Sequence, residues 1–275
     1  MIQRCLAILV ILAALFCTQA AAEETLQVTF YAIGKADAAL ITFADGSRVM
    51  IDAGTNDNGK KLAKRFIKEE IADIDTLIIT HFDKDHVGGA SRILRSCNVN
   101  RVIMPDYEEN SESYLQFLDE LDAWPQTEAV RLEAGEEMTL SFGEAVMRVS
   151  AAKKTYYGKN EVNDFSLAAR IAYGETRFLF TGDAEAKRQK ELLTEGDLAC
   201  NVLKVPYHGG ATYESADFLS ACSPEIAWIP DGEEREADAA LVQYLEEKLG
   251  ADVYRGIDGE DLTVVSDGKT VKVQD

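Results

Sequence analysis

Short apolar runs that end in polar, glycine-marked turns recur along the chain. The run Thr76–Ile79 leads into Thr80–Gly89, Phe178–Phe180 leads into Thr181-Gly182-Asp183, and Leu203–Val205 leads into a turn that carries His208. β-branched and aromatic residues in short runs bounded by such turns are typical of buried strands. Three predicted strands therefore end in histidine or aspartate side chains.

Strands and amphipathic helices are predicted along the rest of the chain, with no repeat, linker or low-complexity tract between them. Residues 23–275 are therefore expected to form one domain. We expect further strands at Leu26–Tyr31, Ala38–Phe43, Arg48–Ile51, Arg101–Met104, Ala129–Leu132, Met138–Phe142, Val146–Ala151, Phe165–Tyr173, Arg177–Phe180, Val202–Val205, Ile226–Ile229, Asp252–Tyr254, Leu262–Val265 and Val271–Val273. Helices are expected at Gly59–Glu70, Gly89–Ser96, Ser111–Ala123, Ala184–Thr194, Ser215–Ser220 and Asp238–Leu249, and a loop at Lys153–Asp164.

The turn after Ile79 carries four candidate metal ligands within six residues, namely His81, Asp83, Asp85 and His86. In an extended chain His81 and Asp83 point the same way, and a turn then brings the other two beside them. Two imidazoles and two carboxylates around one small volume suit one divalent metal ion or a pair of them. The alternatives are a solvated turn and a calcium loop, although the acidic spacing does not follow the EF-hand pattern.

The other two strand ends strengthen the metal interpretation. The chain contains only three histidines, and the third, His208, follows a predicted strand just as the first two do. Asp183 supplies a carboxylate at the end of the strand between them. Ligand-type residues at three separate strand ends argue against a coincidental arrangement.

These motifs together resemble the metallo-β-lactamase superfamily. They are His-x-Asp-x-Asp-His-x-Gly-Gly from His81, Thr-Gly-Asp from Thr181 and Lys-Val-Pro-x-His-Gly from Lys204. The segments 30–38 and 45–54 are similar to the opening strands of the branch that contains the soluble hydrolase domain of the DNA-uptake protein ComEC. The resemblance runs from about Leu26 to at least Thr212. The order of elements fits the α/β fold that it implies, a four-layer αββα sandwich.

The resemblance also implies a two-metal hydrolase. Its ligands would be His81 and Asp83 for one ion, Asp85, His86 and His208 for the other, and Asp183 between the two. A hydroxide bridging two divalent ions would be the nucleophile. Asp85 would orient the hydroxide or carry its proton, and Asp183 would be the second catalytic residue.

Two departures from the family pattern affect the first ion. Asp83 stands where the commoner motif has histidine, which makes that position richer in oxygen and favours manganese without excluding zinc. No histidine lies between His86 and His208. Asn163 and Asp164 occupy the corresponding segment. They would support a ligand or bind substrate, or they simply form the turn that begins a strand.

Three further residues are candidates at the edge of the site. Asp52, at the end of a predicted strand, resembles the acid that orients a ligand in this superfamily, or it is an ordinary turn residue. Lys35 would pair with a substrate phosphate, or it is an exposed turn lysine. Tyr207 would donate a hydrogen bond to a substrate oxygen.

The first 22 residues have the pattern of a secretory signal peptide. Arg4 precedes an apolar run from Cys5 to Phe16, and small residues end at Ala20-Ala21-Ala22. The run is shorter than the about 20 residues that span a bilayer. We therefore expect a secreted, extracellular or periplasmic protein with no membrane span after cleavage. An uncleaved anchor is the alternative.

Three cysteines, Cys97, Cys200 and Cys222, remain after the signal peptide. An odd number in an oxidising compartment leaves two interpretations open. Either two of the thiols form a disulfide and one stays free, or all three are small buried apolar residues.

The net charge of the chain helps to decide which class of substrate it binds. The chain has a net charge of −20, which becomes −21 if Arg4 leaves with the signal peptide. Proteins that track nucleic acids usually present basic surface, so no stable nucleic-acid complex is expected. The basic residues between Lys60 and Lys68 are followed at once by Glu69 and Glu70, and a solvated helix face explains them.

The sequence thus predicts a secreted metal-dependent hydrolase of small phosphoester or nucleic-acid-like substrates. The alternatives are a ComEC-like nuclease acting on DNA, a lactone or β-lactam hydrolase, and a non-enzymatic protein with a vestigial metal site.

Overall fold

The computed structural model describes residues 25–158 and 162–274. The predicted signal peptide, residues 1–22, lies outside the described residues. Within the described ranges no helix combines the length and the apolar character needed to cross a membrane.

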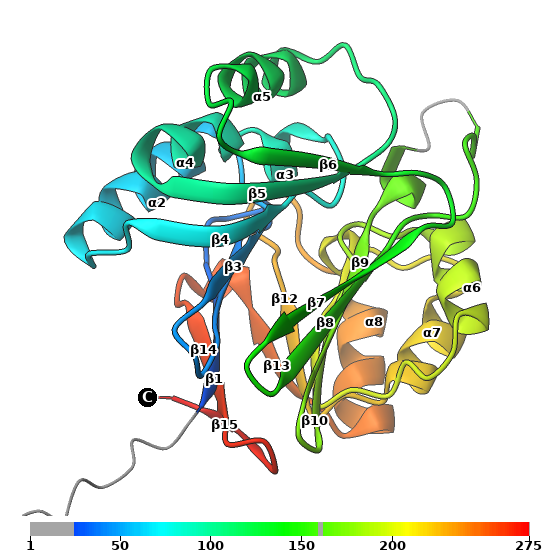
Figure 1. The fold of residues 1–275 in the computed structure, drawn as a ribbon. Coiled ribbons are helices and arrows are strands. Elements are labelled where there is room, and N and C mark those ends of the chain that lie inside the picture. The colour runs from blue at the N-terminus through cyan, green and yellow to red at the C-terminus, as the bar shows by residue number, and fades with distance from the viewer. Residues whose placement is uncertain (1–24, 159–161, 275) are drawn as a thin grey trace, which may run out of the picture.

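Two mixed β-sheets face each other in the described part of the chain (Figure 1). The first has the strand order β15-β14-β1-β2-β3-β4-β5-β6. Pairing is antiparallel from β15 to β3 and parallel from β3 to β6. Its strands are β1 (Leu26–Phe30), β2 (Ala39–Thr42), β3 (Arg48–Ile51), β4 (Asp73–Ile78), β5 (Asn98–Pro105), β6 (Glu128–Leu132), β14 (Leu262–Ser266) and β15 (Val271–Val273).

The second sheet has the order β13-β12-β11-β10-β9-β8-β7. Its pairing is antiparallel from β7 to β10 and parallel from β10 to β13. Its strands are β7 (Glu137–Phe142), β8 (Ala145–Ser150), β9 (Ala168–Tyr173), β10 (Thr176–Phe180), β11 (Val202–Lys204), β12 (Ile226–Ile229) and β13 (Asp252–Arg255).

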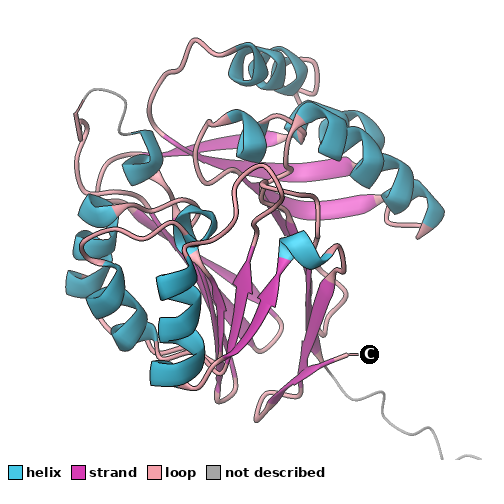
Figure 2. Cartoon of the chain, turned by 180° about the vertical axis from the view of Figure 1, so that it is seen from behind, coloured by secondary structure: helices cyan, strands magenta, loops and turns pink. Residues whose placement is uncertain are grey.

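Helices cover the outer faces of both sheets, so the predicted four-layer αββα sandwich is confirmed (Figure 2). The first sheet is covered by α2 (Asn56–Lys68), α4 (Ala90–Ser96) and α5 (Glu112–Asp122). The second is covered by α6 (Ala186–Thr194), α7 (Ser215–Cys222) and α8 (Ala239–Gln243). The shorter elements are α3 (Lys84–Val87), η1 (Val162–Phe165), η2 (Pro206–Gly209), η3 (Tyr244–Leu249) and η4 (Gly256–Asp258).

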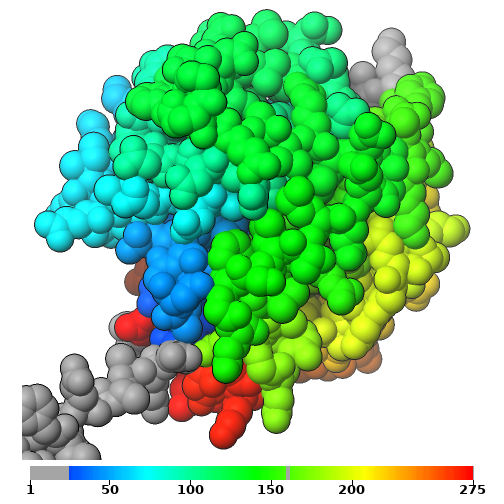
Figure 3. Space-filling model, in the orientation of Figure 1, coloured from blue at the N-terminus to red at the C-terminus, as the bar shows by residue number. Residues whose placement is uncertain are grey.

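Aromatic side chains join the two sheets in the central core. Phe30 of β1 stacks on Phe180 and Trp228 of the second sheet, with ring centroids 5.6 and 5.8 Å apart. Phe43 stacks on Phe142 at 4.2 Å, and at this point the turn after β2 (blue) lies beside the turn after β7 (green) in Figure 3. Offset-stacked rings add to the free energy gained by burying apolar area, so the sheets are held face to face.

The chain after β4 differs from the prediction in one respect that affects the site. A helix was expected to begin at Gly89, but a first helical turn, α3, already begins at Lys84. The two glycines instead allow close backbone contact: a Cβ on Gly88 would lie 2.3 Å from Lys84 O, and one on Gly89 would lie 2.1 Å from Ala53 O. Asp85 and His86 are therefore presented from a helix packed on the end of β3.

A second difference is that β9 begins at Ala168 and not at Phe165. Residues 162–165 form the turn η1, because Asp164 accepts a hydrogen bond from the backbone N of Arg188 at 3.0 Å. The three remaining cysteines are buried free thiols, as in the second of the two interpretations of the sequence.

Candidate metal centre

The ends of three strands deliver the candidate ligands to one edge of the sandwich. His81 follows β4, Asp183 follows β10, and His208 lies in the turn η2 after β11. His208 has a left-handed backbone with φ 50°, which turns the ring back towards the strand ends. Such a conformation is costly for a non-glycine residue and persists only where surrounding contacts hold it.

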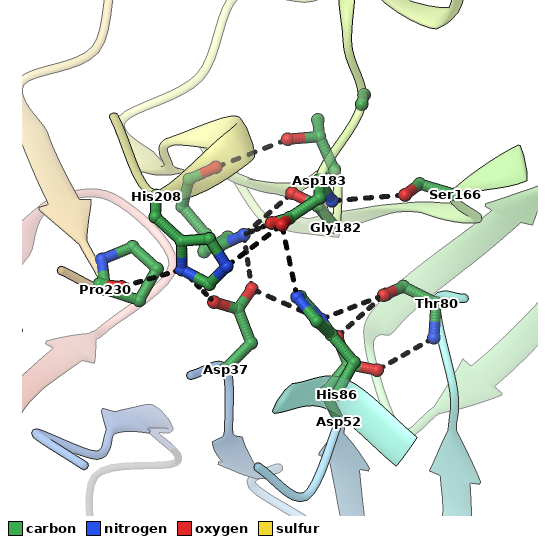
Figure 4. A network of polar contacts seen from close by, with 12 residues as sticks. Asp37, Asp52, Thr80, His86, Ser166, Gly182, Asp183, His208 and Pro230 are labelled. Carbon is green, nitrogen blue, oxygen red and sulfur yellow. Dashed lines mark hydrogen bonds and ion pairs between the residues drawn. The ribbon is translucent and has the colours of Figure 1, made fainter. Parts of the chain in front are cut away.

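Figure 4 shows the imidazoles of His86 and His208 turned towards the Asp183 carboxylate. Asp183 Oδ2 lies 2.9 Å from His208 Nε2 and 3.4 Å from His86 Nε2. Asp85 Oδ2 lies 3.3 Å from His208 Nε2. The structure thus brings together residues that lie far apart in the sequence.

His81 and Asp83 adjoin this group. The His81 ring lies 4.1 Å from the His86 ring, centroid to centroid, and its Nε2 lies 3.9 Å from Asp83 Oδ2. Asp83 is the most open of the six, with 42% of its side chain exposed. Among the six candidate ligands, solvent therefore reaches Asp83 most readily.

Each imidazole is held through Nδ1, which leaves its Nε2 free. His86 Nδ1 lies 2.8 Å from Asp52 Oδ2, and His208 Nδ1 lies 2.8 Å from Pro230 O. His81 Nδ1 lies 3.2 Å from Thr80 Oγ1. All three Nε2 atoms are buried, and none forms a hydrogen bond of good geometry, although that of His208 lies only 2.9 Å from Asp183 Oδ2. Buried polar atoms are nearly always satisfied in folded proteins. Imidazole nitrogens fixed in this way and facing carboxylates suit a divalent metal ion.

Burial and nearby charges set the protonation of the three rings. Burial, and then the neighbouring His86, lower the pKa of His81 to about 3. Burial opposes a charge on His86 too, but the carboxylates of Asp183, Asp37 and Asp52 outweigh it and raise the pKa well above its usual value. His208 is raised to a pKa of about 8, again against burial and mainly by Asp183. A metal ion that bound to His86 and His208 would therefore release protons.

Asp52 lies behind His86, away from its free nitrogen (Figure 4). Its Oδ1 accepts a hydrogen bond from Thr80 N at 2.8 Å, and its Oδ2 accepts one from Thr80 Oγ1 at 2.7 Å. Together with the contact to His86 Nδ1, these bonds fix the orientation of the ring. The residue has φ 56°, a left-handed conformation in which aspartate and asparagine are the best-tolerated non-glycine residues.

Replacing Asp52 by asparagine is expected to weaken metal binding by about 10–100-fold, the usual effect of losing a carboxylate that orients a ligand. Asparagine fits the left-handed backbone and can still accept from Thr80 N, so the fold should persist. Calorimetric titration of chelator-stripped protein with Zn²⁺ or Mn²⁺ measures the change. Unchanged affinity would show that His86 needs no carboxylate behind it.

The three candidate substrate residues lie in different surroundings. Lys35 forms an ion pair with Asp85 Oδ2 and is a quarter exposed. Asn163 donates from Nδ2 to Glu185 Oε1 at 2.8 Å, and its Oδ1 is buried without a partner. The ring of Tyr207 lies under the Arg235 guanidinium, 4.2 Å from its centroid. Of the three, only Lys35 forms an ion pair with a candidate ligand within residues 25–158 and 162–274.

Sequence reasoning missed Asp37 and the function of Lys204. Both side chains are buried and form an ion pair, and Lys204 Nζ also donates to Gly182 O at 2.7 Å and lies 3.5 Å from Asp183 Oδ1. Ligand atoms of Asp37, His86, Asp183 and His208 lie within 4.8 Å of one another. The Asp37 oxygens, however, approach Nδ1 of His208 at 3.5 Å and Nδ1 of His86 at 3.8 Å.

Asp37 is therefore behind the two rings, and the free Nε2 atoms face Asp85 and Asp183 instead. We assign Asp37 to the support of the centre for this reason. A sequence signal did exist, because Asp37 lies in the opening segment that resembles the family, and Lys204 begins the motif that contains His208.

A buried arginine supports the opposite side of the centre. The side chain of Arg188 is completely buried; its Nε donates to Ser166 O at 3.1 Å, and its Nη1 donates to Glu195 Oε1 at 2.5 Å. Ser166 Oγ accepts from Asp183 N at 3.1 Å and lies 3.4 Å from His81 Nδ1. Helix α6 thereby fixes the strand end that carries Asp183.

Comparison with known proteins agrees with this geometry. Residues 33–143 match the model of the metallo-β-lactamase superfamily, a range that contains His81, Asp83, Asp85 and His86. Over these residues the chain is similar to the metallo-β-lactamase superfamily. The fold likeness extends further: the crystal structure of the metallo-β-lactamase fold protein YhfI from Bacillus subtilis superposes with a TM-score of 0.57 at 12% identity, covering 87% of this chain and 100% of that one.

The curated relatives of this metallo-β-lactamase-fold chain are competence and recombination proteins. "Recombination protein 2" of Haemophilus influenzae is 28% identical over 215 residues, which are 76% of this chain and 25% of that protein. "ComE operon protein 3" of Bacillus subtilis is 27% identical over 179 residues, which are 63% of this chain and 22% of that protein. The chain thus spans about a quarter of the length of the curated relatives it matches.

Proposed function

We propose that this protein is a metal-dependent hydrolase of phosphoesters. The observation that supports it most is the set of three buried imidazole Nε2 atoms beside carboxylates. Those of His86 and His208 face Asp183, and that of His81 lies 3.9 Å from Asp83 Oδ2. Members of the metallo-β-lactamase superfamily are commonly metal-dependent hydrolases.

Two divalent ions, zinc or manganese, would be held by His81, Asp83, Asp85, His86, Asp183 and His208. Such ions supply a nucleophile by lowering the pKa of water, and they polarise the phosphoryl oxygen. The side of the site that contains Asp83 is richer in oxygen ligands, which favours manganese. The side where imidazoles predominate favours zinc.

Two side chains of the protein, Asp85 and Lys35, would act on the water molecule and the substrate. Asp85 keeps a pKa well below its usual value despite burial, because His208, His86 and Lys35 stabilise its charge. It is therefore an acceptor that can orient a nucleophilic water molecule. Lys35 forms an ion pair with Asp85 and is partly exposed. Its ammonium group would leave this carboxylate and pair with an anionic oxygen of the substrate.

The test is hydrolysis of a chromogenic phosphodiester by purified protein loaded with Mn²⁺ or Zn²⁺. Activity that is lost in Asp85→Ala and retained in Asp119→Asn, an exposed helix position, supports the proposal. Inactivity with every divalent metal would overturn it. Turnover of nitrocefin or a lactone in place of the phosphodiester would favour carbon–oxygen or carbon–nitrogen bond hydrolysis instead.

DNA cleavage is the second candidate, and the names of the competence relatives favour it. The net charge of −20 argues against tight binding of long nucleic acid. A nuclease should degrade plasmid or single-stranded DNA at a rate that falls steeply with salt, whereas hydrolysis of a small phosphodiester should depend on salt only weakly. The same purified protein, assayed at two salt concentrations, separates the two.

We also propose export of the protein, on the pattern of residues 1–22 alone. Mass spectrometry of the protein from the culture medium or the periplasm tests this: a mature chain beginning at Glu23 is expected.

A further inference from the structure

A groove of about 430 Å³ lies on the outer face of the second sheet. Its walls are strands β8, β9 and β10 and the segment Asp197–Cys200 that follows α6. This volume is within the range of small-molecule sites. None of the six candidate metal ligands lines it.

Three arginines face this groove, although the chain is strongly acidic overall. Arg148 of β8 lies directly opposite Arg170 of β9, and Arg177 of β10 pairs with Ala172, two residues along β9 on the same face. Like charges directly opposite each other destabilise a sheet. The groove therefore concentrates positive charge at a free-energy cost that an anionic ligand would offset.

The acidic residues nearby do not neutralise these arginines fully. Glu195 Oε2 accepts from Arg170 Nη2 at 3.1 Å, but its Oε1 is taken by the buried Arg188. Arg170 Nε is buried without a hydrogen-bond partner. The exposed Arg148 has no ion-pair partner among residues 25–158 and 162–274.

Asp197 is the one carboxylate among the residues that line the groove, and its Oδ1 already accepts from Ala199 N at 3.0 Å. The three guanidinium groups therefore exceed the acidic charge within the groove itself. Guanidinium groups match phosphate oxygens with paired N–H donors, which makes arginine the usual residue for binding phosphate.

We propose that this groove binds the phosphate group of a small phosphorylated ligand, at a site separate from the metal centre. Arg148 and Arg170 would hold the phosphate between them, and Arg177 would contact a second phosphate or an adjoining anionic group. The apolar side chains of Val146, Leu179 and Leu198 line the rest of the groove and suit the uncharged part of such a ligand.

Calorimetric titration with inorganic pyrophosphate tests the proposal on the full chain. Four proteins are compared: the wild type, Arg148→Ala/Arg177→Ala, Asp183→Asn and Arg101→Ala. Arg101 is the matched control, because it forms an exposed ion pair with Glu128 on the other sheet. Loss of two charged hydrogen-bond donors is expected to weaken pyrophosphate binding by about 10–100-fold or more in the double variant.

Asp183→Asn and Arg101→Ala should bind pyrophosphate as the wild type does. Absence of saturable binding in the wild type would overturn the proposal, as would a loss in Asp183→Asn, because pyrophosphate would then occupy the metal centre. Equal weakening in Arg101→Ala would indicate non-specific charge and would also overturn it. Repeating the titration with adenosine triphosphate, inorganic phosphate and a short single-stranded oligonucleotide identifies the source of the phosphate; binding of the oligonucleotide alone would contradict a small-ligand site.

Discussion

Replacing Asp183 by asparagine is expected to lower metal affinity by at least ~100-fold and to remove phosphodiester hydrolysis with it. Losing a residue that only orients a ligand weakens metal binding by up to about 100-fold. Losing a ligand itself should weaken metal binding at least as much. Asp183 Oδ2 contacts Nε2 of both His86 and His208, whereas Asp85 Oδ2 contacts that of His208. Metal content after dialysis, together with a titration of the stripped protein, measures the loss.

Asp183→Asn is also expected to change the protonation of the His86 and His208 imidazoles. Burial opposes ionisation of Asp183, but His208, His86 and Lys204 hold its pKa well below the usual value. Without this carboxylate the rings lose the main charge that raises their own pKa values. Fewer protons should therefore be released on any residual metal binding, which titrations in buffers of different ionisation enthalpy detect. Asp119→Asn is the control, and retention of full metal affinity in Asp183→Asn would contradict the assigned site.

Replacing Lys204 by methionine is expected to destabilise the fold by about 3–5 kcal/mol, because it leaves Asp37 buried without its ion-pair partner. For a chain of this size the melting temperature should fall by about 6–20 °C. The pair is buried on both sides, so water cannot replace the lost ammonium group. Thermal and urea unfolding measure the change, with the exposed Lys61→Met as control.

The loss of stability in Lys204→Met should grow with pH. Burial raises the pKa of Asp37 and Lys204 lowers it, so removing the lysine raises this pKa further. A carboxyl group with a raised folded-state pKa stabilises the fold while it is protonated at low pH, and this contribution is lost as the pH rises. The double variant Asp37→Asn/Lys204→Met should recover part of the stability. Equal destabilisation at pH 5 and pH 8, with no recovery in the double variant, would show that Lys204 acts through packing alone.

Local patterns in the sequence were sufficient to predict most of the fold. Apolar runs of strand length and helical spacing determine which face of each element is buried, and that requires no tertiary information. Some elements begin a few residues earlier than predicted, as α2 does at Asn56 and β5 at Asn98, and two further differences fall at the site. Helix α3 begins before Gly88 and η1 replaces the start of β9, because contacts with Ala53 and Arg188 override the local preference.

The sequence by itself predicted the types of the candidate ligands and their positions at strand ends. Only the folded chain brings the end of β4, in the first sheet, beside the ends of β10 and β11, in the second. Only the tertiary structure decided how each imidazole is oriented and which charges surround it. Two contacts join segments from separate strands: the bond between Asp52 and His86, and the ion pair of Asp37 with Lys204. The left-handed backbone at His208 likewise depends on surrounding contacts. Their direction depends on packing across the sandwich, which no local pattern encodes, and for this reason the buried lysine at the centre could be found only in the folded chain.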